Sequence, residues 1–319
     1  KGEYMRIVFM GSPEFAVDSL KALVEASQHE VVAVITQPDR PKGRGQKVLM
    51  TAVKEYALTK NLPVLQPAKI RTKEFVEELK ALEPELIVVV AFGQFLPKDI
   101  LQMPKYGCIN VHASLLPKYR GAAPIHYAIM NGEKETGVTI MMMDVGMDTG
   151  DMLAKSVTQI SNDMTMGVLH DQLKIDGATL LLDVVEGLEK GTIKPVPQND
   201  DEATYASLLD KEIEKIEWDR TAQEIHDKVR GLNPWPGAHS ILPDGRNLKI
   251  WQTLVVEREY PGVRPGTIVE LTKNGFIIVC GKACLEVLEV QPESKKKMAA
   301  DVFCNGYKIK SGEILSLEV

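Results

Sequence analysis

The sequence predicts an α/β protein, with a Rossmann-like, doubly wound and mostly parallel sheet followed by a small OB-like β-barrel domain. In the first half, near-continuous apolar runs alternate with helical periodicity, as in a parallel sheet that is covered on both faces. In the second half, short apolar runs are separated by glycine and proline turns, which is typical of a small antiparallel barrel. The length of 319 residues is sufficient for two such domains.

Five apolar runs of the first half predict its strands. They span residues 6–10, 31–35, 86–90, 108–111 and 138–143. After the first run, Ser12 is expected to cap a helix that has Pro13 at its first position and Glu14 in its first turn. A long helix is predicted over 165–190, and Gly191 is expected to end it.

Ligands of a doubly wound sheet bind at the carboxyl ends of its strands. The segments that follow the predicted strands are therefore expected to form the rim of a ligand site along one edge of the sheet. These segments are 11–13, 37–47, 91–97 and 110–117.

The apolar pattern changes after residue 193. Two prolines, three acids and little periodicity over 194–204 indicate a linker. The domains are thus predicted at 5–193 and 209–319, with the linker at 194–208. In the second domain a helix is predicted at 221–229, and strands are predicted at 238–242, 248–256, 266–271, 275–279 and 284–290.

Composition argues against several classes of protein. The net charge is −6, so the surface is not uniformly basic, although a local patch can still bind nucleic acid. No apolar run approaches the ~18 residues of a membrane span, and the first run is too short for a signal peptide. The four cysteines lack zinc-site spacing, so we expect reduced thiols, no metal site and a cytoplasmic protein.

Two basic patches stand out against this acidic background. The first has four cations in eight residues, and the second has three cations in a row. They consist of Arg40, Lys42, Arg44 and Lys47, and of Lys295, Lys296 and Lys297. A solvated charged loop is the ordinary explanation of either charge run taken alone.

The end of the fourth predicted strand carries two polar side chains, Asn110 and His112. Residues two apart on a strand point to the same face, and an unsatisfied polar pair there is costly. An amide donor beside an imidazole suits the oxygen of a carbonyl that becomes tetrahedral, and imidazole can also move a proton near neutral pH. On spacing alone, a hydrogen-bonded pair that merely closes the strand is the more common explanation.

A tight polar loop follows the fifth predicted strand, with two glycines and three acids within residues 143–152. A carboxylate from this loop can orient His112 or accept a proton from an incoming ammonium. We choose Asp148 over Asp144 and Asp151 because the small residues beside it allow the backbone to approach a ligand. Turn-forming and capping roles are the alternative for these acids.

Three longer motifs follow one another around these residues. They are Asn110-x-His112-x-Ser-Leu-Leu-Pro117, Arg120-Gly-Ala-Ala-Pro-Ile125 and Asp144-x-Gly-x-Asp148-Thr-Gly-Asp151. Together they resemble the signature of folate-dependent formyltransferases. Within that superfamily the chain is most similar to the methionyl-tRNA formyltransferase family, from residues 9–15 through 233–237 to the terminal barrel.

The resemblance implies that the chain transfers the formyl group of 10-formyltetrahydrofolate, a co-substrate, to the α-amino group of methionyl-initiator tRNA. It implies that Asn110, His112 and Asp148 are the catalytic set and that no metal is required. It also implies that the 40–47 loop enters the acceptor arm of the tRNA, and the barrel lysines fit the same partner. The implied folate contacts are Ser114, Leu115, Leu116 and Pro117. A monomer is expected.

The closest alternative is a formyltransferase or formyl-hydrolase that acts on a small-molecule amine. Such enzymes resemble the first half of the chain, but they lack the terminal barrel and the basic loop. A non-catalytic RNA-binding protein is disfavoured by the intact catalytic set. A NAD-dependent dehydrogenase is disfavoured because the segment 11–14 lacks the Gly-x-Gly-x-x-Gly fingerprint.

Overall fold

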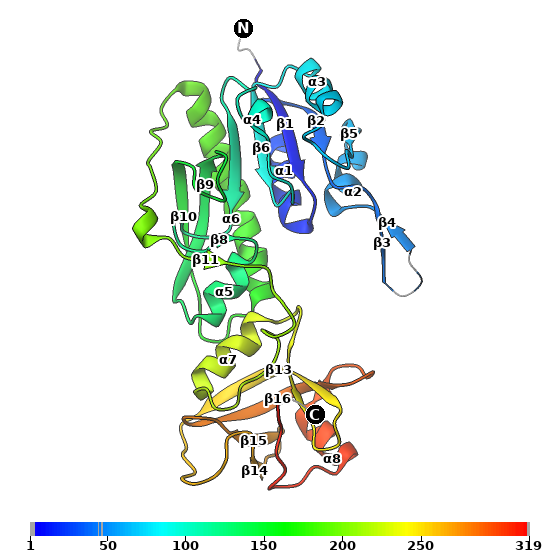
Figure 1. The fold of residues 1–319 in the computed structure, drawn as a ribbon, viewed down its shortest axis with the longest axis vertical. Helices are drawn as coiled ribbons and strands as arrows, with labels where there is room; N and C mark the ends of the chain where they lie inside the picture. The colour runs from blue at the N-terminus through cyan, green and yellow to red at the C-terminus, as the bar shows by residue number, and fades with distance from the viewer. Residues whose placement is uncertain (1–3, 44, 46, 318–319) are drawn as a thin grey trace. The chain divides into compact units, whose positions relative to one another are not determined.

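The computed structural model describes residues 4–43, 45 and 47–317, which form two compact units (Figure 1). The first unit is built from the residues up to 121 together with 135–159 and 170–206. The second is built from 122–134, 160–169 and the residues from 207 onward. Each unit therefore combines segments that lie far apart in the sequence.

A seven-stranded sheet forms the centre of the first unit, in the order β10-β9-β7-β6-β1-β2-β5. Neighbours from β7 to β5 pair in parallel, whereas β9 is antiparallel to both β7 and β10. The mostly parallel α/β sheet is therefore confirmed. The strands are β1 (Arg6–Gly11), β2 (Glu30–Ile35), β5 (Val64–Leu65), β6 (Leu86–Val90), β7 (Cys108–His112), β9 (Glu135–Met142) and β10 (Met152–Gln159).

Helices cover both faces of this sheet because its central strands are apolar on both sides. All five residues of β6 are buried. On one face, Gly177 of α6 lets that helix approach the side chains of Val111 and Val138. On the other face, an apolar cluster joins β1 and β6 to α3 and α4. The helices beside this sheet are α1 (Glu14–Glu25), α2 (Ala52–Thr59), α3 (Lys73–Ala81), α4 (Lys98–Leu101) and α6 (Met166–Lys190).

The predicted cap of the first helix is wrong. Helix α1 begins at Glu14, and its N-cap is Pro13, which makes no side-chain cap. The Ser12 hydroxyl instead accepts the Gln37 N–H at 3.1 Å and a hydrogen bond from Thr36 at 3.3 Å. Ser12 therefore joins the ends of β1 and β2, and this partner lies 25 residues away, beyond the reach of a local capping rule.

The second unit contains an antiparallel sheet in the order β12-β13-β16-β15-β14, with β17 paired to β16. The residues 313–316 close this sheet, because they hydrogen-bond to Ile241 at one edge and to Ile268 at the other. The predicted small β domain is thus confirmed. Its strands are β12 (Ala238–Ile241), β13 (Asn247–Val256), β14 (Ile268–Leu271), β15 (Phe276–Val279), β16 (Cys284–Pro292) and β17 (Met298–Ala299).

The helix predicted at 221–229 is α7 (Ala222–Gly231). It starts with a capping box, in which Thr221 and Glu224 satisfy each other's backbone N–H groups. Two other helices lie in this unit, α5 (Pro124–Met130) and α8 (Ala300–Tyr307), and α5 packs against α7. Among the described residues, no helix combines the length and the apolar character needed to cross a membrane.

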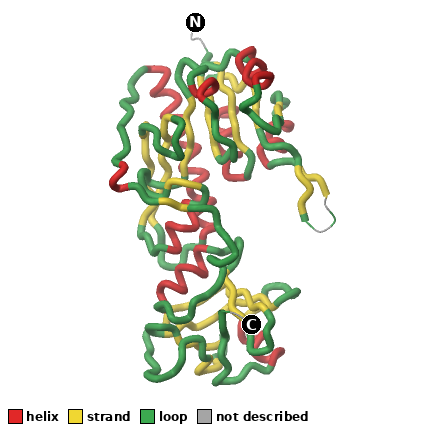
Figure 2. The backbone as a smooth tube through the Cα atoms, viewed as in Figure 1, coloured by secondary structure: helices red, strands yellow, loops and turns green. Residues whose placement is uncertain are grey.

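Two segments outside the main sheets carry structure that the sequence analysis did not predict. The 37–47 segment was expected as a loop, but it contains β3 (Arg40–Lys42), which pairs with β4 (Lys47–Leu49) in a hairpin. Figure 2 shows this hairpin extending from the first unit. The predicted linker contains a 3₁₀ helix, η1 (Asp200–Glu202), and β11 (Tyr205–Ala206), which pairs with β8 (Arg120–Gly121).

Candidate active site

His112 is the last residue of β7, and only 7% of its side chain is exposed. Its Nε2 lies 2.9 Å from the carbonyl oxygen of Tyr119. Because a carbonyl can only accept, Nε2 carries a hydrogen in this contact and donates it. The other ring nitrogen, Nδ1, is therefore the one that faces the acidic loop.

Asp148 supplies the carboxylate on that side. Its Oδ2 lies 3.7 Å from Nδ1 of His112, which is an ion-pair distance but too long for a hydrogen bond. The same oxygen accepts the Gly121 N–H at 2.7 Å. Acceptors therefore face both ring nitrogens, so the surroundings would stabilise an imidazolium formed during a reaction by charge and by hydrogen bonding.

Asn110 lies two residues before His112 on the same strand and is half-buried. Its Nδ2 donates to the carbonyl oxygen of Val89, on the neighbouring strand β6, at 3.2 Å. An amide nitrogen carries two hydrogens, so this bond orients the group and leaves a second hydrogen for another acceptor. Asn110 and His112 thus lie two residues apart on β7, so both side chains belong to one face of the strand, and Asn110 keeps one donor free.

The loop that carries Asp148 begins beside the start of β7 and not beside its end. Because β9 runs antiparallel to β7, its end lies beside the start of β7, and the Met143 N–H donates to the Cys108 carbonyl. The loop must then turn back along β7 for Asp148 to reach His112. Asp144 stabilises this turn, since its Oδ1 accepts the Gly146 N–H at 2.9 Å and the Thr149 hydroxyl at 2.6 Å.

Residues 114–117, which were predicted to contact folate, form a turn directly after β7. Ser114 and Leu116 are fully buried, and the Ser114 hydroxyl donates to a main-chain carbonyl of the same turn at 2.6 Å. Leu115 and Pro117 are half-buried. Ser114 and Leu116 brace the turn from inside, so Leu115 and Pro117 offer the side-chain surface that a ligand can contact.

Two family models match the chain. Residues 5–185 match the formyl transferase domain, and residues 208–308 match the formyl transferase C-terminal domain. Curated methionyl-tRNA formyltransferases are similar over almost the full length. The protein from Acetivibrio thermocellus is 49% identical over 98% of this chain and 99% of its own, and the one from Clostridium botulinum is 51% identical with the same coverage.

This chain belongs to the methionyl-tRNA formyltransferase family. A solved N-formyltransferase from Helicobacter canadensis, in complex with folinic acid and dTDP-3-aminofucose, has a similar fold. Its TM-score is 0.65 at 24% identity, covering 89% of this chain and 99% of the other. HypX from Aquifex aeolicus in complex with tetrahydrofolic acid gives 0.64 at 19% identity, covering 96% and 48%.

The basic residues that were predicted to bind tRNA lie on exposed parts of each unit, as far as the structure describes them. Arg40 and Lys42 are on β3, Lys47 is on β4, and all three are exposed, whereas Arg44 lies outside the described residues. Lys295, Lys296 and Lys297 are exposed in the turn between β16 and β17. The Lys297 ammonium also lies 3.7 Å from the centre of the Trp251 ring, a cation–π contact.

One group of side chains in the described residues has the spacing of a metal site. Possible ligand atoms of Glu14, His170 and Asp171 lie within 4.8 Å of one another. The Lys174 ammonium forms an ion pair with Glu14 and lies 3.8 Å from Asp171 Oδ1. Because this lysine already supplies the positive charge that the two carboxylates attract, we do not propose a metal site here.

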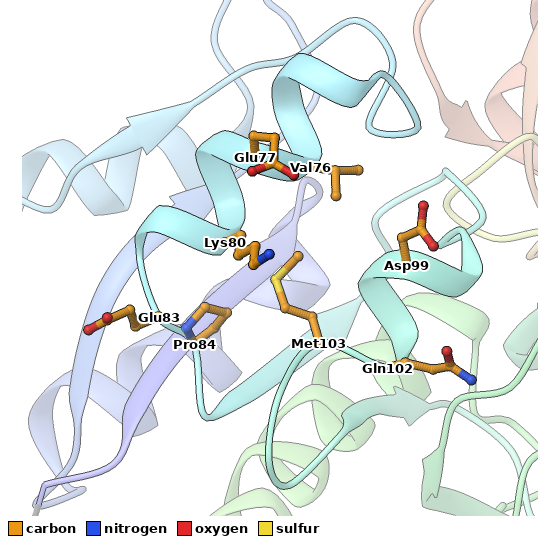
Figure 3. A pocket seen from close by; sticks show the side chains of 8 residues that line it. All are labelled: Val76, Glu77, Lys80, Glu83, Pro84, Asp99, Gln102 and Met103. Carbon is orange, nitrogen blue, oxygen red and sulfur yellow. The ribbon is translucent and has the colours of Figure 1, made fainter.

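A cavity of about 500 Å³ lies at the opposite end of the parallel strands (Figure 3). Pro84, just before β6, and Met103, just after α4, are in its wall. Figure 3 shows that its acidic groups point in different directions and do not converge on one point. It contains none of the predicted site residues; its lining is Val76, Glu77, Lys80, Glu83, Pro84, Asp99, Gln102 and Met103.

The four cysteines are free thiols in buried positions. Burial raises the pKa of Cys108 and of Cys280 to about 12, and that of Cys304 to about 11. Because the thiolate is the reactive form, we expect the native protein to react with a disulfide reagent at about pH 8 far more slowly than the unfolded protein does. A thiol titration with and without denaturant checks this, and rapid modification of Cys108 in the native state would contradict it.

Sequence reasoning missed three residues that support the candidate site, directly or through another residue. Arg120 stands in one of the recognised motifs, and this was the signal that the sequence offered. In the structure it is 2% exposed, and a buried cation needs hydrogen-bond partners. Gln198 and Thr204 belong to the predicted linker. No local pattern marks them, because their partners lie tens of residues earlier in the chain.

Proposed function

We propose that this chain transfers the formyl group of 10-formyltetrahydrofolate to the α-amino group of methionyl-initiator tRNA, with Asn110, His112 and Asp148 as the catalytic set. The observation that supports the proposal is the 3.7 Å approach of Asp148 to His112, two residues after Asn110 on β7, in a chain that is about half identical to methionyl-tRNA formyltransferases over 98% of its length. We expect a monomer that acts in the cytoplasm.

In the proposed reaction the neutral α-amine attacks the formyl carbon, a new C–N bond forms, and the bond from that carbon to N10 of the folate breaks. The formyl oxygen becomes an oxyanion in between. Asn110 donates its second amide hydrogen to this oxygen, while the bond to Val89 keeps the amide group in place. Preorganised donors of this kind are usually the largest contribution to catalysis of acyl transfer.

His112 manages the proton that the attacking amine loses. Its Nε2 hydrogen is held by the Tyr119 carbonyl, so Nδ1 accepts the proton from the amine. Asp148 then faces the imidazolium at 3.7 Å and stabilises its charge. The same proton is passed to N10 as the folate leaves, so the enzyme returns to its starting state and protons balance.

Cys108 is not needed as a nucleophile. It lies two residues before Asn110, but burial raises the pKa of its thiol to about 12, and its sulfur donates to the Ile100 carbonyl at 3.6 Å. A neutral, hydrogen-bonded thiol is a poor nucleophile. The geometry supports direct transfer from folate to amine without a covalent enzyme intermediate.

The test is formylation of charged tRNA by the purified protein. With 10-formyltetrahydrofolate as donor, we expect methionyl-initiator tRNA to be formylated much faster than methionyl-elongator tRNA or free methionine. Formylation of the free amine at the same rate would instead indicate a small-molecule transferase, and consumption of the donor with release of formate alone would indicate a hydrolase.

The hairpin provides a separate prediction about the tRNA. We expect Lys42→Ala and Lys47→Ala each to raise the KM for tRNA and leave the KM for folate unchanged. If each lysine contacts one phosphate, the slope of log affinity against log salt should fall by about 1 per substitution. Lys69→Ala, which removes another exposed lysine of the first unit, is the matched control. An unchanged salt slope in both hairpin variants would contradict the prediction.

A further inference from the structure

The side chain of Gln198 connects two parts of the candidate active site, the Asp148 loop and Arg120. Its Nε2 donates to the main-chain carbonyls of Asp148 and Gly150, at 2.8 and 2.7 Å. Its Oε1 accepts two hydrogen bonds from the Arg120 guanidinium, at 3.1 and 2.9 Å. Both amide hydrogens and the amide oxygen are thus used, and one side chain ties the Asp148 loop to Arg120.

Arg120 determines which way this amide points. A guanidinium can only donate, so the Gln198 oxygen must face Arg120 and the nitrogen must face the loop. Arg120 is 2% exposed, and its NH2 also donates to Asp200 Oδ1 at 2.7 Å. A buried cation requires such partners, and this requirement holds the donor end of Gln198 against the two carbonyls.

The loop needs this support because its backbone is strained at the catalytic acid. Asp148 has φ = +56°, in the left-handed region that favours glycine. Such a conformation persists only where the surroundings hold it. The Gly121 N–H holds the carboxylate, and Gln198 holds the carbonyl of the same residue, so the two contacts fix both ends of Asp148.

The same segment also supports the histidine. The Tyr119 N–H donates to the Thr204 hydroxyl at 2.8 Å, and the Tyr119 carbonyl in turn accepts from His112. Residues 196–206, which we call the strap, therefore contact the backbone on both sides of the His112–Asp148 pair. The sequence predicts this segment as part of the linker at 194–208.

We propose that Gln198 is a positioning residue of the active site, which holds the Asp148 loop so that the carboxylate faces His112. This inference rests on the proposed function. Gln198 does not touch His112, and its effect on the reaction passes through Asp148. Loss of its two donated hydrogen bonds lets the loop relax from the strained conformation and moves the carboxylate away from the imidazole.

Two substitutions at this position separate positioning from simple stability. Gln198→Ala removes all the contacts. Gln198→Glu keeps an acceptor for Arg120, as an ion pair, but removes the donors to Asp148 and Gly150. Because a displacement of about 1 Å can cost about a hundredfold in rate, we expect each variant to lower kcat at least about tenfold. The KM values for folate and tRNA should stay near those of the wild type.

The control is Asn199→Ala, which removes the side chain of the adjacent residue in the strap. Asn199 is exposed and only caps η1, accepting the Asp201 N–H at 3.1 Å. We expect this variant to keep kcat within about twofold of the wild type, as for a surface site that touches neither the loop nor Arg120. Thermal unfolding of all variants identifies any that fail to fold, and Gln198→Glu should remain folded because Arg120 keeps its partner.

A double-mutant cycle decides whether Gln198 acts through Asp148. If it does, adding Gln198→Glu to Asp148→Asn should change kcat little, because the function being positioned is already lost. A folded Gln198→Glu variant with wild-type kcat would overturn the inference, and so would a full additive loss in the Asp148→Asn background. Absence of methionyl-tRNA formylation by the wild type would overturn the proposed function instead.

Discussion

Replacing His112 with alanine is expected to lower kcat/KM for formyl transfer by about 10²–10⁴-fold, the usual contribution of a general acid–base group. The substitution removes the ring nitrogen that we propose accepts the amine proton, and with it the imidazole that faces Asp148 at 3.7 Å. Because His112 is not one of the implied folate contacts at 114–117, folate binding should change little. Single-turnover formylation of methionyl-tRNA, with folate affinity measured separately, checks both statements.

The matched control is His170→Ala, which removes another histidine of the first unit. His170 lies on α6, where its Nδ1 is 3.1 Å from Asp171, and the proposed reaction does not use it. We expect near wild-type transfer from this variant. Unchanged transfer by His112→Ala would remove His112 from the catalytic set, whereas a parallel loss of folate affinity would show that it acts in binding.

Replacing Gly150 with alanine is expected to abolish most of the activity without touching a catalytic side chain. A β-carbon at this position would lie 1.6 Å from the main-chain oxygen of Met142, so the loop must move. The carbonyl of Gly150 also accepts a hydrogen bond from Gln198, and a shift breaks this contact. Since a displacement of about 1 Å can cost about a hundredfold, we expect at least that loss in kcat.

Gly146→Ala is the control for this substitution, because it lies in the same loop. Its new β-carbon would meet the Thr149 hydroxyl at 2.0 Å, but that group belongs to a side chain that can rotate. We expect a much smaller loss of kcat. Equal losses in the two variants would show that the loop tolerates no substitution of glycine at all, and that the contact with Met142 has no special importance.

Strands with continuous apolar runs and helices with a strong apolar periodicity could be predicted from the sequence. The predicted strand at 86–90 is β6 (Leu86–Val90), because continuous β-branched residues suit a strand that is buried on both faces. The predicted helix at 165–190 is α6, which ends where Gly191 adopts φ = +66°. These patterns reflect burial along one element and need no knowledge of its neighbours.

Elements with weak local signals were missed. β10 (Met152–Gln159) is a sheet edge in which half-buried and exposed residues alternate over most of its length, and no strand was predicted there. β3 consists of Arg40, Pro41 and Lys42, which have little strand propensity, and it forms only by pairing with β4. In both cases the partner strand, and not the segment's own composition, determines the structure.

The residues of the candidate active site also divide into those with a local signal in the sequence and those that depend on tertiary contacts. Spacing predicted that Asn110 and His112 form a pair on one strand face, and the small residues beside Asp148 favoured it over Asp144. The structure brings Asp148 to His112, while Asp144 is occupied in the turn. Which ring nitrogen of His112 is held by a main-chain carbonyl could not be predicted from sequence, since it depends on Tyr119, seven residues later, after a turn of the chain.

The sequence by itself determined the strands with continuous apolar runs, the apolar helices and the residue types of the site, because each depends on neighbours a few positions away. Only the tertiary structure decided that β9 runs antiparallel to β7, that the Asp148 loop folds back to His112, and that Gln198 holds it there. The physical reason is the separation along the chain between the residues that interact. Periodicity records which side of an element is buried, whereas a hydrogen bond between residues fifty positions apart leaves no pattern in either segment.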